Sequence, residues 1–154
     1  MNEEKAIRLD RMRFTKNSLP ASLALLAIIF NVLYFANIYE SNVASWYYNI
    51  LMGASILYNL VFMLTAFLSS EGVKNYKPTF SYVMFVLAAI QIARIFIYPV
   101  KAHAQPGLMS DFQFIRLIAY LVGSALCLVA AALINLAKSR ALATHTASLE
   151  AGKA

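Results

Sequence analysis

With 154 residues, 61% hydrophobic and only 13% charged, the chain is long enough for one domain but too apolar for an ordinary soluble one. The net charge of +6 comes from basic residues outside the apolar runs, which favours a membrane surface over nucleic acid. The single cysteine, Cys127, excludes an intramolecular disulfide, and His103 and His145 lie far apart outside the runs. We therefore expect no metal, haem or other cofactor.

Residues 1–18 mix five basic residues with three acidic ones, and they predict a basic cytoplasmic arm beside the membrane. The first apolar run, residues 19–39, has the length of a membrane span. It is too long for the core of a signal peptide and should remain in the protein.

The second predicted span covers residues 46–68 and opens with Trp46, Tyr47 and Tyr48, a trio typical of the membrane interface. The link before it holds no Lys or Arg. The link after it, residues 69–77, combines Gly72 with Lys74 and Lys77, which is typical of a short cytoplasmic turn.

The third predicted span, residues 79–98, lies between two prolines and carries Gln91 and Arg94 one helical turn apart. The longest link between spans follows, with a turn expected at Pro106 and Gly107. The fourth predicted span is residues 112–136. Residues 137–154 are expected to form a cytoplasmic tail that is disordered beyond its first turns.

Charge distribution predicts the orientation. Of the 13 Lys and Arg residues, ten fall in the N-terminal arm, the 69–77 link and the tail, which four spans place on one side. The positive-inside rule puts that side in the cytoplasm. The prediction is an all-α integral membrane four-helix bundle with short loops and both termini cytoplasmic, located in the plasma membrane.

Each predicted span has one polar residue near its middle, and we expect these residues to lie at a similar depth: Asn31, Asn59, Gln91 and Ser124. Amide groups in hydrocarbon seek hydrogen-bond partners on other helices. Two interpretations remain open for this polar mid-membrane cluster. It either clasps the helices together or forms the floor of a solute site.

Charged residues near the opposite surface form a predicted outer charged cluster of Arg94, Arg116, Asp111 and Glu40. Arg94 is close enough to the span end to extend its side chain to the headgroups or to pair with a carboxylate. The alternative is an outward-facing site that binds an anion or docks a partner.

The fourth span repeats small residues every four positions, at Ala119, Gly123, Cys127 and Ala131, and the repeat continues to Asn135. Such spacing lines one helical face and allows another helix to approach closely, either within one bundle or from another subunit. We therefore predict a helix-packing face, on which Cys127 is a small packing residue and not a nucleophile.

The predicted spans contain no carboxylate and no histidine, which removes the proton carrier of coupled exporters and the ligands of haem cytochromes. With no catalytic constellation, we expect that the protein is not an enzyme. The leading hypothesis is an accessory or structural subunit of a larger membrane assembly, docking through its transmembrane helices. The alternative is an oligomeric small-solute transporter or channel with a polar mid-membrane site. Expected partners are the lipid bilayer and other membrane subunits or further copies of the chain, and no nucleic acid.

Overall fold

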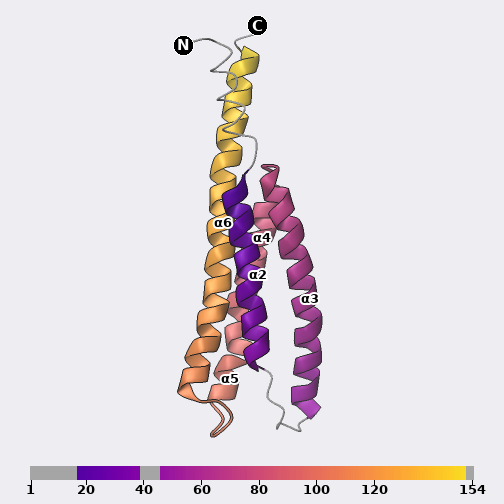
Figure 1. The fold of residues 1–154 in the computed structure, drawn as a ribbon, viewed down its shortest axis with the longest axis vertical. Coiled ribbons are helices and arrows are strands. Elements are labelled where there is room, and N and C mark those ends of the chain that lie inside the picture. The colour runs from indigo at the N-terminus through magenta and orange to yellow at the C-terminus, as the bar shows by residue number, and fades with distance from the viewer. Residues whose placement is uncertain (1–16, 39–45, 152–154) are drawn as a thin grey trace.

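The computed structural model describes residues 17–38 and 46–151, and this part of the chain is helical almost throughout. Its helices are α2 (Ser18–Ile38), α3 (Trp46–Lys74), α4 (Thr79–Ile97), α5 (Pro99–His103) and α6 (Asp111–Ala151). The four long helices lie side by side, and α5 is a short segment at one end of the bundle (Figure 1). The predicted all-α four-helix bundle is confirmed.

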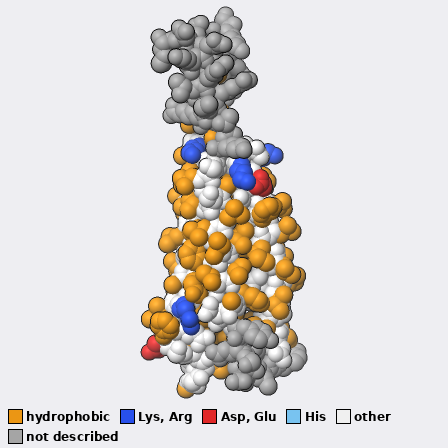
Figure 2. Space-filling model, viewed as in Figure 1, with side chains coloured by type: hydrophobic (Ala, Val, Ile, Leu, Met, Phe, Trp, Pro, Cys, Tyr) orange, Lys and Arg blue, Asp and Glu red, His pale blue; other side chains and the backbone are white. Residues whose placement is uncertain are grey.

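The four long helices are each long and apolar enough to cross a membrane. Hydrophobic side chains cover the visible flank of the bundle, and Lys and Arg gather near its two ends (Figure 2). The protein is therefore a multi-pass membrane protein whose apolar flank suits contact with lipid.

The turn between α3 and α4 is tighter than the sequence predicts, because α3 continues to Lys74. Tyr76 adopts a left-handed conformation with φ 57°. Its N–H donates to the Val73 carbonyl at 3.1 Å, and the Lys77 N–H donates to the Gly72 carbonyl at 3.3 Å, which together close a Schellman motif. A Cβ at Gly72 would lie 2.0 Å from the Phe80 ring, so only glycine permits this close approach.

The C-terminal tail is helical to Ala151, so the expectation that it is disordered beyond its first turns is corrected. Helix α6 has 41 residues and continues to Ala151, so at 1.5 Å per residue it is about 60 Å long. Residues 137–151 contain neither Gly nor Pro and are rich in alanine, which favours helix. The helix consequently extends well beyond the rest of the bundle (Figure 1).

The buried residues of α2, α4 and α6 recur every three or four positions, which gives each helix one inward face. On α2 the face includes Ala24, Ala27, Asn31, Tyr34 and Ile38. On α4 it includes Ser81, Met84, Ala88, Gln91 and Arg94. On α6 it includes Leu117, Leu121, Ser124, Leu128, Ala131 and Asn135. Helix α3 buries the smallest share of its apolar length, 22% against 33–39% for the other three.

Two apolar cores fill the bundle. One contains Ala24, Phe62, Met84 and Leu128, in the half that includes the α3–α4 turn. The other contains Tyr34, Ile38, Met52, Leu117 and Leu121, in the half that includes α5. Buried polar side chains lie between these two groups along α2, α4 and α6, and they form the candidate site.

Candidate functional site: a buried polar layer between two apolar cores

The predicted polar mid-membrane cluster lies in one layer across the bundle. Asn31, Gln91 and Ser124 are completely buried, and Asn59 is 5% exposed. Each comes from a different long helix, so the layer joins all four. We call these four residues, together with Arg94 and Tyr58, the polar layer.

Side-chain hydrogen bonds connect the layer continuously. Asn31 Nδ2 donates to Asn59 Oδ1 at 2.8 Å. Gln91 Nε2 donates to Asn31 Oδ1 and to Ser124 Oγ, each at 3.0 Å. The Ser124 hydroxyl in turn donates to the Ala27 carbonyl at 3.0 Å. The network thus ties α2 to α3, α4 and α6 by direct bonds.

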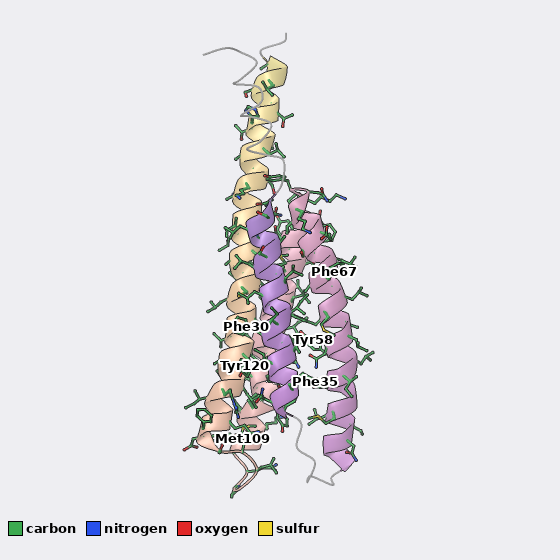
Figure 3. All side chains as sticks on the ribbon, viewed as in Figure 1. Phe30, Phe35, Tyr58, Phe67, Met109 and Tyr120 are labelled. Carbon is green, nitrogen blue, oxygen red and sulfur yellow. The ribbon has the colours of Figure 1, made fainter. Side chains whose placement is uncertain are left out.

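Arg94 belongs to this layer and is only 8% exposed. Its Nη1 donates to Asn31 Oδ1 at 2.8 Å and to Gln91 Oε1 at 2.9 Å. Its guanidinium carbon lies 4.6 Å from the centre of the Tyr34 ring and 4.3 Å from that of Tyr58. Each such cation–π contact contributes about 0.5–2 kcal/mol. Tyr58 lies on the side of α3 that faces α2, as Figure 3 shows.

Arginine determines the direction of every bond in the network, because a guanidinium has donors and no acceptor. Arg94 therefore requires the oxygen of Asn31 and the oxygen of Gln91. Asn31 then has only its NH₂ group to offer Asn59. Two buried atoms of the layer are left without partners, Arg94 Nη2 and Asn59 Nδ2, and both are donors. The layer is thus short of an acceptor.

A small cavity of about 30 Å³ lies next to Arg94, between α2, α3 and α4. Its polar lining residues are Tyr34, Ser55, Arg94 and Tyr98, and its apolar ones are Leu51, Met52 and Ile97. One water molecule needs about 10–15 Å³, so the cavity has room for about two. A buried arginine with an unpaired donor thus borders a cavity large enough for a small ligand.

The structure divides the predicted outer charged cluster. Arg94 does not extend to the surface but hydrogen-bonds within the polar layer, because amide oxygens and tyrosine rings are available there. Arg116 lies over the Phe112 ring at 5.1 Å. Asp111 lies 3.7 Å from His103. Glu40 lies outside the described residues. The expectation that Arg94 groups with Arg116 and Asp111 is therefore corrected.

The predicted helix-packing face is displaced around α6. Ala119 is exposed, Gly123 and Cys127 are half-buried, and Ala131 and Asn135 are fully buried. The inward face instead follows Ser124, Leu128, Ala131 and Asn135, with alternating steps of four and three. A strict step of four rotates slowly around a helix of 3.6 residues per turn and leaves the face. Gly123 still permits a close contact, because its Cβ would lie 3.3 Å from the Phe30 ring.

A second polar clasp was not predicted as a site. Asn135 Oδ1 accepts from Asn17 Nδ2 at 3.0 Å, and Asn135 Nδ2 donates to Ser81 Oγ at 2.8 Å and to the Lys77 carbonyl at 3.1 Å. The signal in the sequence was an asparagine near the end of an apolar run, directly comparable to Asn31. Tyr34 was also missed, since a tyrosine inside a span carries no distinctive spacing.

Comparisons with protein-family models, with curated proteins and with solved structures find no match to this chain.

Proposed function

We propose that this multi-pass membrane protein is non-catalytic and binds a small polar solute at Arg94, as a member of the transporter or channel class. The observation that carries the proposal is the unpaired Nη2 of buried Arg94 beside a cavity. An ionisable group on a spanning helix costs roughly 2.5–3.5 kcal/mol by insertion scales, and such groups typically mark solute or ion pathways.

A purely structural clasp explains less of the layer. The amides of Asn31, Asn59 and Gln91 and the hydroxyl of Ser124 already join all four long helices. Arg94 adds a bond to Asn31 Oδ1, which the clasp already uses, and a bond to Gln91 Oε1, which also accepts from the Tyr58 hydroxyl. It also adds a charge and an unpaired donor. A leucine at this position would cost less free energy to bury. Packing alone therefore does not explain the arginine, whereas binding of a ligand does.

Passage of a solute would require a conformational change. Apolar side chains including Phe62, Met84 and Leu128 fill the bundle on the far side of the layer from the cavity. Helix α3 is the element best suited to move, because it buries the smallest share of its apolar length. The site is thus proposed to exchange solute with the side of the membrane nearer α5, which the charge distribution assigns to the exterior.

An accessory subunit of a membrane assembly is the second candidate. It is favoured by a shallow apolar groove of about 350 Å³ between α4 and α6, lined in part by Ala88, Ala89 and Ala125. Small residues permit close approach of another membrane helix. In this alternative the groove holds a helix of a partner subunit, and the polar layer only stabilises the bundle.

Purification in mild detergent at native expression, followed by mass spectrometry and a solute screen, separates the two candidates. The solute proposal expects no stoichiometric partner and expects at least one small solute to raise the Tm. That shift should disappear in Ser55→Leu, which fills the cavity while leaving Arg94 in place. A stoichiometric second protein that is lost from Ala89→Leu, an exposed residue of the groove, would instead support the accessory role.

A further inference from the structure

We infer that the solute held at Arg94 is a small inorganic anion of about the size of a halide ion. The inference deepens the proposed function and rests on it. It follows from the charges, the donors and the size of the site, each of which is described by the structure.

The first argument is charge. Arg94 is the one buried side chain with a permanent charge among the residues that the structure describes. Of the carboxylates whose side chains are described, Glu71 pairs with Lys74 and Asp111 faces His103. Among the described residues, the positive charge is therefore solvated by neutral groups, which are two amide oxygens and the side chains of two tyrosines. Removing a charge from water without a counter-charge costs several kcal/mol, and a bound anion offsets this cost.

The second argument is hydrogen bonding. Both unpaired buried atoms of the polar layer, Arg94 Nη2 and Asn59 Nδ2, are donors. Ser55, whose hydroxyl can donate, and two tyrosines are among the residues that line the cavity beside Arg94. None of the described residues that line it is a carboxylate. Such a site binds an acceptor and repels a cation.

The third argument is size. At about 30 Å³ the cavity has room for about two water molecules. A halide ion is only slightly larger than one water molecule, and it needs no specific shape of pocket. A phosphate has four oxygens and demands more space, particularly when it is esterified in a lipid headgroup. The dimensions therefore favour a dissolved halide-sized anion over a lipid phosphate.

The test measures anion binding to the full-length protein purified in neutral detergent. Equilibrium binding of ³⁶Cl⁻ should saturate at one ion per chain and should be competed by bromide but not by gluconate, which is far too large. Replacing gluconate with chloride at constant ionic strength should raise the Tm. The rise should be about 5 °C or more when the chloride concentration is a hundredfold above its Kd.

Two matched variants locate the site. Ser55→Leu should abolish saturable ³⁶Cl⁻ binding, because its side chain fills the cavity. Gly53→Leu adds comparable volume on the same helix, where a Cβ meets nothing within 4 Å, and it should bind chloride as wild type does. Arg94→Lys should retain weaker binding, since lysine keeps the charge without the planar fork.

The possible failures have different meanings. If wild-type protein binds no anion but a neutral or cationic solute raises its Tm in a Ser55-dependent manner, the anion inference is wrong and the proposed function stands. If no solute of any class does so, both are wrong. Stabilisation by vesicles of phosphatidylglycerol over phosphatidylcholine without chloride binding would identify a lipid phosphate and overturn the inference. Anion binding that is seen only in Glu40→Gln would identify Glu40 as the counter-charge of Arg94 and would also overturn the inference.

Discussion

Asn135 joins three parts of the chain through one side chain. Its amide contacts Asn17 before α2, the Lys77 carbonyl in the α3–α4 turn and Ser81 in α4. It is fully buried, so water does not replace a bond that is lost. A buried polar group left without a partner costs about 1–3 kcal/mol. Asn135 therefore stabilises the end of the bundle at the α3–α4 turn, as the polar layer stabilises its middle.

We predict that Asn135→Leu lowers the free energy of unfolding by about 2–4 kcal/mol, because it leaves more than one buried group unpaired while keeping the side-chain size similar. Thermal or denaturant unfolding in detergent measures the loss. Thr65→Val is the control, because the Thr65 hydroxyl bonds only to the Val61 carbonyl of its own helix. An equal effect of the two substitutions would contradict the role assigned to Asn135.

Helix α6 shows which side of an apolar helix faces inward. Leu117, Leu121, Ser124, Leu128 and Asn135 are all fully buried. The small-residue repeat lies beside this face, and Gly123 contacts Phe30 of α2 at its edge. Volume added at Gly123 must displace that ring, whereas volume added at exposed Ala119 enters the lipid.

We expect Gly123→Leu to lower stability by about 1–3 kcal/mol through overpacking against Phe30, and Ala119→Leu to change it by less than about 0.5 kcal/mol. The melting temperatures of the two variants in one detergent provide the comparison. If Ala119→Leu proves the more harmful, the inward face of α6 is assigned wrongly.

The four membrane spans were largely predictable from the sequence, but the side of each helix that faces the interior was not. Apolar length and flanking charge predicted the four spans, because insertion in lipid depends mainly on composition. The end of α3 was misplaced because the left-handed residue that follows the helix is Tyr76, whereas this position is usually occupied by glycine or asparagine. Hydropathy also does not distinguish a side that faces lipid from one that faces protein, since both are apolar. The buried face of α6 therefore required the structure.

The sequence predicted four residues of the polar layer but not the place of Arg94 within it. A polar residue in an apolar span must find partners, which identified Asn31, Asn59, Gln91 and Ser124 together. The position of Arg94 near the end of its span favoured a surface location. Only the structure reveals that Tyr34 and Tyr58 provide an interior alternative.

At the scale of the whole molecule, the start of α2, the α3–α4 turn and the projecting part of α6 lie at one end (Figure 1). We predict that this end is cytoplasmic. In a Cys127→Ala background, a single cysteine at Ala104 should react with an impermeant reagent in intact cells. Cysteines at Asn75 and Thr146, both exposed in the structure, should react only after permeabilisation. The reverse pattern would invert the topology and place the cavity near the cytoplasm.

The bond between Asn17 and Asn135 joins residues 118 positions apart, and this separation has a consequence for synthesis. At about 5–20 residues per second, the ribosome makes Asn135 about 6–24 s after Asn17. During that interval α2 is in the membrane without α6, which supplies much of its packing surface. Asn31 can bond Asn59 of α3 soon after both emerge, whereas Arg94 follows later, together with Gln91 on α4, and finds Asn31 already in place. The order of the chain thus ensures that the charged helix enters last among the partners of Asn31.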